Sequence, residues 1–447
     1  MTEATLSDDA RALRHRVFRA MARGPDAPQP NVYRGYLPLR SAAKDAVEEY
    51  RAGFMTFMTS NWEGLSETFR LLEDAYSKNL FVDLLAFRAI GQNNVDLFPD
   101  REFYFAALRH SGSMPATASE FSKFPGGQLI NQFEVEIGGK CHKIDCLRDN
   151  IFFSFMLKQY FFSKYGIEIK PSRGDHAIDA GACFGDTALS FSAAVGSSGC
   201  VYCFDPLDVH LQIIRSNLQR NGIDNVMVIP AGLGESNEDG TPVRNKVNPG
   251  FSAVENATKI PVHSIDALVE ERVLARIDFI KMDIEGHELS ALRGAENSIR
   301  RFLPKLAISL YHAWDDYIDI PRYIDGLNLG YRFYLENYTV SDGETVLYCV
   351  ADPGACTTKS DRSRRLSSSD LTETINDLAG AIQNVDALQM LSESLDDAER
   401  RVRQIVTRRK KTRDEPFSEE LGQPGSRPTR VRRTNRSGGS TSDGGQA

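Results

Sequence analysis

The N-terminal part of the chain carries apolar residues at helical spacing. Between residues 41 and 108, two amphipathic faces are marked by Val47, Tyr50, Phe54 and Phe57 and by Phe69, Leu72 and Tyr76. Over residues 133–145 the pattern changes to alternation around Gly138 and Gly139, which is typical of a β-hairpin. We therefore predict a mainly helical cap region with a hairpin over residues 41–149. Residues 1–40 are expected to be a flexible N-terminus, since Gly and Pro accumulate there.

Short apolar runs alternate with amphipathic stretches over residues 150–353. The pattern predicts strands at 177–179, 201–204, 226–229, 277–282, 306–310, 332–337 and 345–350. Helices fit between the first five, for example 209–221 and 288–302, and an aromatic-rich helix is expected over 150–165. Strands that alternate with helices indicate a doubly wound α/β fold with a mostly parallel sheet. The last two strands are joined by a short turn, which predicts an antiparallel edge hairpin.

The composition becomes polar after residue 353. Residues 354–369 are expected to be a linker, and residues 370–407 a long amphipathic helix that begins with a capping box of Asp370 and Glu373. Its apolar spacing shifts by one step part-way along. The helix therefore forms either a short coiled-coil seam, through which the chain would self-associate, or an amphipathic face packed on its own domain. Residues 408–447 are expected to be a disordered basic tail.

Charge is distributed unevenly along the chain. The formal net charge is −8, from 53 Lys and Arg against 61 Asp and Glu, yet residues 400–436 hold thirteen basic and four acidic residues. Such a segment can contact RNA or another anionic surface. Its Gly, Ser, Pro and Arg content is more typical of a solvated tail. Nucleic acid is therefore kept only as an alternative partner.

Composition also restricts the cellular context. No apolar run is long enough to span a bilayer, and the charged N-terminus lacks the apolar core of a signal peptide. We expect a cytoplasmic protein. The seven cysteines are scattered, so a disulfide framework is not expected. Cys200 and Cys203 lie three positions apart on a predicted strand and would face opposite sides, which does not suit a metal or redox pair.

A glycine turn between a strand and a helix is the most informative motif. The strand ends at Asp179, Gly181 and Gly185 form the turn, and a helix opens at Asp186 and Thr187. Exposed backbone N–H groups and a helix N-terminus suit a nucleotide-like ligand. A dinucleotide fingerprint needs G-x-G-x-x-G, whereas this turn has G-x-x-x-G after a carboxylate. A carboxylate suits the amino group of a methionine moiety, which favours S-adenosyl-L-methionine over an ordinary strand–turn–helix junction.

Two further strand ends carry polar side chains. Asp205 ends the second strand, where a carboxylate can accept hydrogen bonds from both ribose hydroxyls of an adenosine. The fourth strand delivers Lys281 and Asp283, and Glu285, Gly286 and His287 crowd the turn that follows. Ligands of open α/β sheets bind beyond the carboxyl ends of strands. We therefore expect Asp283 and Glu285 to face the sulfonium methyl group.

The fifth strand places Tyr311 and His312 on the same rim. Four runs of the sequence, DAGACFGDTAL, VYCFDP, IKMDIEGHE and RGAENSIRRFLPKLAISLYH, resemble the FkbM family of S-adenosylmethionine-dependent methyltransferases. The resemblance covers roughly residues 140–352. It implies a class I methyltransferase fold and, usually, methylation of a hydroxyl on a sugar, polysaccharide or polyketide product. The K-x-D-x-E-G-x-E run is the specific part, whereas many methyltransferase groups share the glycine motif.

The resemblance assigns roles by position. It places the cofactor at Asp179, Gly181 and Gly185, the ribose at Asp205, and the family signature at Lys281, Asp283, Glu285, Gly286 and Glu288. The sequence departs from the family pattern at Asp205, where Glu is commoner, and at His287, where a small residue is common.

These residues predict base-assisted transfer of a methyl group to a hydroxyl of a small molecule or glycan. A hydroxyl is a weak nucleophile unless a base takes its proton, and we expect Asp283 or His312 to do so while Glu285 and His287 orient the acceptor. No residue set dictates a metal, although two carboxylates and a histidine holding Mg²⁺ are an alternative. A nucleic-acid or other N-methyltransferase and a non-catalytic scaffold with this fold are the rival functions.

Overall fold

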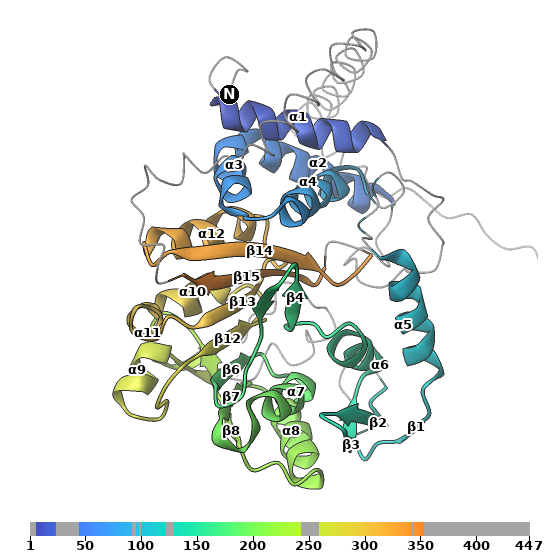
Figure 1. Ribbon diagram of the computed structural model, residues 1–447, viewed down its shortest axis with the longest axis vertical. Helices are drawn as coiled ribbons and strands as arrows, with labels where there is room; N and C mark the ends of the chain where they lie inside the picture. Colours follow the sequence, from blue (N-terminus) through green and yellow to red (C-terminus); the bar gives the residue numbers. More distant parts are fainter. Residues whose placement is uncertain are drawn as a thin grey trace, which may run out of the picture. The chain divides into compact units, whose positions relative to one another are not determined.

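A seven-stranded sheet in the order β14-β15-β13-β12-β6-β7-β8 forms the centre of the computed structural model (Figure 1). Its strands are β6 (His176–Ala180), β7 (Cys200–Phe204), β8 (Val226–Ile229), β12 (Phe279–Met282), β13 (Lys305–Ser309), β14 (Tyr331–Asn337) and β15 (Thr345–Ala351). Neighbouring strands are parallel except at β15, which runs antiparallel to both β13 and β14. This is the sheet of the class I methyltransferase fold, and it confirms the predicted mostly parallel sheet with an antiparallel hairpin at one edge.

The structure describes residues 6–23, 44–91, 95, 97, 100–121, 129–242, 259–340 and 343–352. The linker, the amphipathic helix and the basic tail expected from residue 354 onward therefore lie outside the described residues. All described residues belong to one compact unit. Among them, no helix combines the length and the apolar character needed to cross a bilayer.

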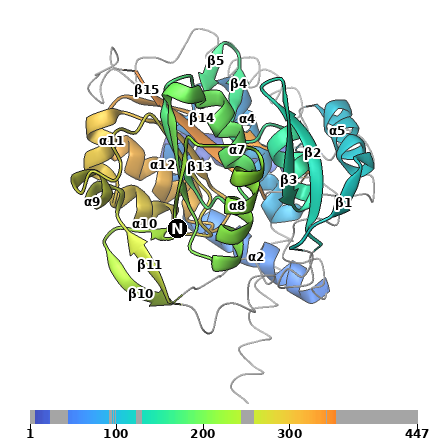
Figure 2. The same ribbon diagram turned by 90° about the horizontal axis from the view of Figure 1, so that it is seen from below.

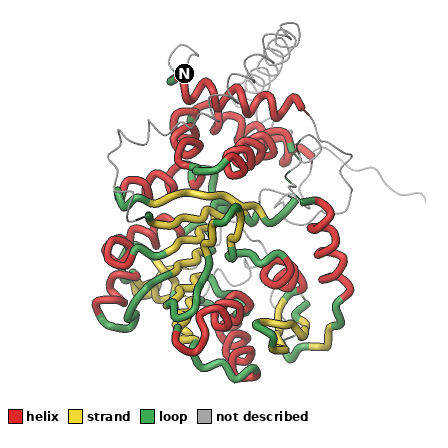
Figure 3. The backbone as a smooth tube through the Cα atoms, viewed as in Figure 1, coloured by secondary structure: helices red, strands yellow, loops and turns green. Residues whose placement is uncertain are grey.

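Alternate residues of the central strands face two separate parts of the core. Ile178 of β6 and Ile280 of β12 pack on one side, in a cluster with the helices over residues 288–326. Ala177 and Phe279 pack on the other side, against Phe191 of the helix over residues 186–195 and the aromatic residues of 152–162. Strands that are buried on both faces read as continuous apolar runs, which is why they were recognisable in the sequence. Figure 2 shows the two helix layers on opposite sides of the strands, and Figure 3 shows the strands between them.

The helices that cover the sheet are mostly those expected. They are α7 (Asp186–Val195), η4 (Gly196–Ser198), α8 (Asp208–Arg220), α9 (Ile265–Glu270), α10 (Glu288–Arg293), α11 (Glu296–Phe302) and α12 (Asp316–Gly326). The single helix predicted over 288–302 is wrong, because it is divided into α10 and α11 at Gly294. A Cβ atom on Gly294 would lie 2.0 Å from the carbonyl oxygen of Gly234, so the two backbones approach too closely for a side chain. Gly234 directly follows β9 (Gly232–Leu233), which forms a small sheet that was not predicted with β10 (Glu238–Pro242) and β11 (Lys259–His263).

The N-terminal helices pack against the edge of the sheet. They are α1 (Asp8–Arg23), α2 (Lys44–Ser60), α3 (Trp62–Leu71) and α4 (Ala75–Ile90). The helix α4 contacts β14, and α3 contacts α12, where the Thr68 hydroxyl donates to the carbonyl oxygen of Tyr317 at 2.7 Å. The helix α1 corrects the expected flexible N-terminus over residues 1–40. Leu6, Ala10, Leu13, Val17 and Ala20 of this segment are buried at helical spacing against α3 and α4, and the intervening charged residues hid that pattern.

The segment that leads to the first central strand differs partly from the prediction. It contains α5 (Arg101–Ser113), β1 (Ala116–Ala118), β2 (Asn131–Ile137), β3 (Lys140–Cys146), α6 (Arg148–Asn150), the π-helix η3 (Ile151–Met156), β4 (Phe162–Lys164) and β5 (Ile167–Ile169). The hairpin of β2 and β3 confirms the alternation around Gly138 and Gly139. The helix expected over 150–165 is wrong beyond residue 156. Lys158 and Tyr160 adopt left-handed backbone conformations (φ of 54° and 69°), which end the helix, and the short β4–β5 hairpin follows.

Candidate active site

The glycine turn between β6 and α7 lies beside the end of β12. Gly181 and Gly185 both have left-handed φ angles, of 80° and 79°. A Cβ atom on Gly181 would lie 1.9 Å from the carbonyl oxygen of Asp283, so only glycine allows the two strand ends to meet. The strands β7 and β12 flank β6 on opposite sides, which makes this edge the switch point where open α/β sheets bind ligands.

Asp179, at the end of β6, is fully buried and paired within the protein. One of its carboxylate oxygens accepts a hydrogen bond from the Thr187 hydroxyl at 2.6 Å, and the other lies 3.1 Å from the Lys281 ammonium. Lys281 also donates to the carbonyl oxygens of Ala180 and Gly181. Burial alone would lower the pKa of Lys281, but the carboxylates of Asp179 and Asp283 outweigh it and the pKa is raised. The positive partner of Asp179 in this structure is therefore the Lys281 ammonium, and the Thr187 hydroxyl is engaged by the same carboxylate.

Asp186, the first residue of α7, is also buried. Its carboxylate accepts hydrogen bonds from the Ser154 hydroxyl and from the Asn150 side chain, and burial raises its pKa. Both partners come from the segment before the first central strand, so that segment fixes the N-terminus of α7.

Asp205, at the end of β7, closes the other side of the glycine turn. Its two oxygens accept hydrogen bonds from the backbone N–H groups of Cys183 (3.0 Å) and Leu207 (2.9 Å). The Nδ1 atom of His210 lies 3.0 Å from one of them. Cys183 belongs to the turn and has a φ of 50°, so Asp205 fixes a strained residue of the turn.

Asp283 follows β12 and is held by two tyrosine hydroxyls. Tyr160 donates to one carboxylate oxygen at 2.8 Å, and Tyr311 donates to the other at 2.9 Å. Burial would raise the pKa of Asp283, but His312, Lys281 and these hydroxyls together lower it. Asp283 is therefore an ionised carboxylate in a fixed orientation.

His312 lies among three carboxylates. Its Nδ1 atom is 3.0 Å from Glu288, and its Nε2 atom is 3.4 Å from Asp283 and 3.7 Å from Glu285. These contacts are ion pairs by distance and do not have the geometry of hydrogen bonds. Burial would lower the pKa of His312, but the three carboxylates raise it to about 10. The ring is thus an imidazolium at neutral pH.

Glu285 is the exposed member of this cluster. Its side chain is 39% exposed, whereas that of Glu288 is fully buried. Burial and the neighbouring carboxylates raise the pKa of Glu285 to about 7, although His312 opposes them. The residue has a left-handed φ of 57° and is followed by Gly286 with a φ of 90°. A strained, partly exposed carboxyl group with a pKa near neutrality is typical of a functional position.

The chain matches one family model across the strands that carry this site. Residues 179–333 match the model described as the methyltransferase FkbM domain. The chain therefore contains an FkbM methyltransferase domain. The match begins at Asp179 and includes both the glycine turn and the Asp283–His312 region.

Solved structures with the same kind of fold are similar only at low sequence identity. One is the FkbM methyltransferase from Methylobacillus flagellatus KT, with 22% identity and a TM-score of 0.43 over 67% of this chain and 62% of that one. The chain thus spans less than two thirds of that protein. Fibrillarin from Aeropyrum pernix, solved with bound S-adenosyl-L-methionine, has 12% identity and a TM-score of 0.28 over 53% of this chain and 98% of that one. An rRNA methylase from Streptococcus thermophilus has 17% identity and a TM-score of 0.28 over 41% and 89%. No curated protein matches the chain.

The FkbM domain brings most of the predicted site residues together. Asp283, Glu285 and His312 form one cluster, as the shared strand ends predicted. His287 is separate from it, because it is the exposed N-cap residue of α10. The orienting role expected of His287 therefore has no structural support beyond its place in the sequence.

Two residues of the site were missing from the sequence analysis. Tyr160 precedes the FkbM domain and reaches Asp283 only because the backbone turns sharply at Lys158 and Tyr160. Glu344 lies in the β14–β15 turn, is buried, and accepts a hydrogen bond from Gln159 at 2.7 Å. Burial and Asp283 raise the pKa of Glu344 to about 8. The left-handed φ of these residues has no signature in a single sequence, and both sit far from the motif.

The same cluster has the donor types of a cation site. Atoms of Asp283, Glu288 and His312 lie within 4.8 Å of one another. The ring of His312 lies between these carboxylates, so the imidazolium supplies the positive charge that a metal ion would supply. One imidazolium thus faces two carboxylates of this group, and Glu285 lies 3.7 Å from the same ring.

Proposed function

We propose that the protein transfers a methyl group from S-adenosyl-L-methionine to a hydroxyl of a small molecule or glycan, such as a sugar, a polysaccharide or a secondary metabolite. The observation that carries this proposal is the Glu285 carboxyl group, which sits at the β12 end of the switch point with a pKa of about 7. The glycine turn, Asp205 and the start of α7 fit the cofactor, because they place backbone N–H groups and a carboxylate at one sheet edge.

Glu285 is the residue we assign as general base, in place of Asp283 or His312. A base works best when its pKa is close to the working pH. The pKa of Asp283 is lowered and both of its oxygens face tyrosine hydroxyls, while His312 already carries a proton. Asp283 and His312 therefore carry fixed charges that orient the side chains of the site, and Glu285 is the residue that can accept the proton.

The reaction is an in-line displacement for which the sulfonium cofactor supplies the methyl group. As the bond between the acceptor oxygen and the methyl carbon forms, the carbon–sulfur bond breaks and its electron pair stays on sulfur. The acceptor proton moves to a carboxylate oxygen of Glu285. Asp283, fixed by Tyr160 and Tyr311, would keep the acceptor aligned with the methyl group.

Replacing Glu285 with Gln tests this assignment. We expect kcat to fall by about 10²–10⁴-fold, because the proton would have no acceptor, while affinity for the cofactor changes less than twofold. The measurement is transfer of labelled methyl from the cofactor into a fractionated small-molecule and polysaccharide extract, with cofactor binding measured by calorimetry. Glu134→Gln, on the exposed face of β2, is the matched control.

The pH profile gives a second test of the same residue. Glu285 must be unprotonated to accept a proton, so kcat/KM should fall about tenfold per pH unit below pH 7 and level off above it. A full-rate Glu285→Gln variant would contradict the base assignment. Failure of the wild-type protein to bind the cofactor would instead favour a non-catalytic scaffold.

A further inference from the structure

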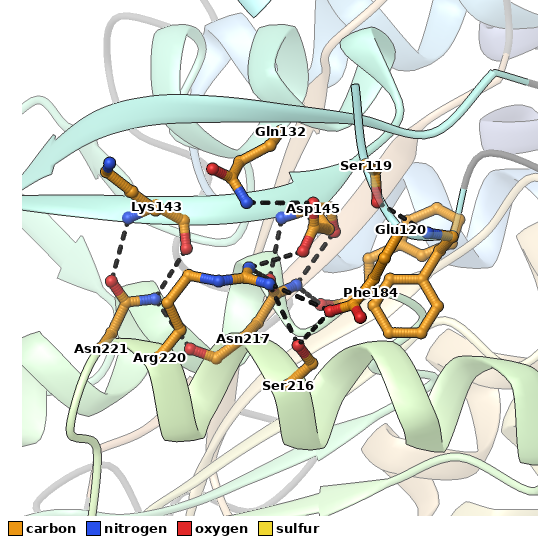
Figure 4. A network of polar contacts seen from close by, with 11 residues as sticks. Ser119, Glu120, Gln132, Lys143, Asp145, Phe184, Ser216, Asn217, Arg220 and Asn221 are labelled. Atoms are coloured by element: carbon orange, nitrogen blue, oxygen red, sulfur yellow. Dashed lines mark hydrogen bonds and ion pairs between the residues drawn. The ribbon is translucent and has the colours of Figure 1, made fainter. Parts of the chain in front are cut away.

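Two asparagines of α8 pair with the outer edge of the β2–β3 hairpin (Figure 4). Asn217 accepts from the backbone N–H of Asp145 at 2.8 Å and donates to its carbonyl oxygen at 2.9 Å. Asn221, one helical turn later, does the same with Lys143, at 2.9 and 2.8 Å. Each side-chain amide thus satisfies the backbone groups that a further strand would satisfy, and the edge of β3 is covered.

Asn217 makes two contacts that Asn221 does not make. Its amide oxygen accepts a second hydrogen bond, from the Arg220 guanidinium at 3.2 Å. Asn217 is fully buried and also donates to the carbonyl oxygen of Phe184 at 2.9 Å. Phe184 immediately precedes Gly185, the N-cap residue of α7. Asn221 is half-buried and has no contact with the turn; its remaining bond is to the carbonyl oxygen of Asn217. One amide therefore joins the hairpin, α8 and the glycine turn.

We propose that Asn217 is a positioning residue for the cofactor turn, and that the hairpin is thereby part of the cofactor-binding site. The turn contains Cys183 at a left-handed φ of 50°, and a non-glycine residue keeps that conformation only where its surroundings hold it. Asp205 holds the N–H of Cys183 on one side. Asn217 holds the next carbonyl, that of Phe184, on the other side.

The hairpin is itself fixed to α8 by a second, charged contact. The Asp145 carboxylate is fully buried and lies 2.5 Å from the Arg220 guanidinium. Arg220 also lies 3.4 Å from Glu120 (Figure 4). Because the hairpin cannot move away from α8 without separating this pair, the Asn217 amide has a rigid partner against which to hold the turn. The hairpin precedes residue 179, where the family match starts.

The inference rests on the proposed function, and cofactor affinity tests it without knowledge of the acceptor. We expect Asn217→Ala to raise the Kd for S-adenosyl-L-methionine at least tenfold, by calorimetry, because the turn loses its support. Asn221→Ala, which removes the equivalent pairing one turn away, should leave that Kd within twofold. Both variants should lower Tm, so a difference in affinity between them cannot come from loss of stability alone.

Each outcome is decisive. If wild-type protein binds and both variants bind equally well, or lose affinity equally, Asn217 is structural only and the inference is wrong. If wild-type protein does not bind, the proposed function fails before the inference is reached. Asn217→Ser, which keeps a small polar side chain, and Arg220→Met, which removes both the pair with Asp145 and the 3.2 Å contact with the Asn217 amide oxygen, serve as further variants if Asn217→Ala does not fold. Arg220→Met should also weaken cofactor binding.

Discussion

The rim after β6 and the rim after β12 both carry carboxylates, yet they treat charge in opposite ways. At the first, one oxygen of the Asp179 carboxylate lies beside the Lys281 ammonium, and the other accepts a hydrogen bond from the Thr187 hydroxyl. At the second, three carboxylates share a single imidazolium, and the outermost of them, Glu285, keeps a pKa near neutrality. Balanced charge gives stability, whereas crowded charge leaves a group that exchanges protons. The comparison therefore separates the residues that build the candidate site from the one that we propose as the base.

Removing the cation of the balanced rim should give the largest effect. Lys281→Met would leave the Asp179 carboxylate buried and unpaired, which costs about 3–5 kcal/mol of unfolding free energy. Lys143→Met is the control, because its pair with Glu134 is exposed and should contribute only about 1 kcal/mol or less. Urea denaturation measures both. Equal losses in the two variants would show that the first rim is not a buried ion pair of the kind described.

A second substitution, Asp179→Asn, tests whether the stability lost in Lys281→Met comes from the unpaired carboxylate. The double variant Asp179→Asn, Lys281→Met lacks both charges of this pair and should recover most of the lost stability. The Thr187 hydroxyl can still donate to the amide oxygen.

The contact between the two rims should give the next largest effect. Gly181→Ala places a Cβ atom 1.9 Å from the Asp283 carbonyl oxygen and forces an alanine to a φ of 80°. Gly139→Ala, at a φ of 77° with nothing within 4 Å, experiences only the backbone strain, about 1–2 kcal/mol. We expect Gly181→Ala to lose clearly more unfolding free energy than this, and to lose cofactor binding, which Gly139→Ala should retain. If the two variants lost equal unfolding free energy and both kept cofactor binding, the close contact between Gly181 and Asp283 would matter for neither property.

The crowded rim should make stability depend on pH. The pKa of His312 is about 10 in the folded protein against an ordinary value near 6.5, so its stabilising contribution is complete below pH 6.5 and is lost as the pH rises toward 10. Urea titrations at several pH values should show this decline, and His312→Gln should flatten it. A decline that persists in His312→Gln would assign it to another group.

Much of the fold was predictable because the central strands are buried on both faces. Apolar runs such as 201–204 and 306–310 are buried and too short for a typical helix, and the glycine turn marked the end of the first central strand. The division at Gly294 was not predictable, since its cause is the backbone of Gly234, sixty residues earlier in the sequence. The helix α1 was missed because its buried face consists partly of alanine, which carries little hydrophobic signal.

The sequence identified members of the candidate site, but it did not indicate the roles that we propose for them. Asp283 and Glu285 were expected at one rim because they follow the same strand. His312 was expected there because it follows the neighbouring strand. Roles depend on partners that come from other parts of the chain. The hydroxyl of Tyr160 lowers the pKa of Asp283, and the buried carboxylate of Glu288 raises that of His312. These contacts decide which residue is free to act as a base, and no local pattern encodes them.

The position of β15 determines where the chain can be shortened. The strand lies between β13 and β14 and is hydrogen-bonded to both, although it is the last of the three in the sequence. A truncation at residue 333, the end of the family match, would remove β15, cut β14 short and leave the backbone of β13 unpaired along one side. Apolar strands with open edges join those of other molecules. Expression of the matched segment alone should therefore give aggregates, and the shortest well-behaved fragment must extend at least to Ala351.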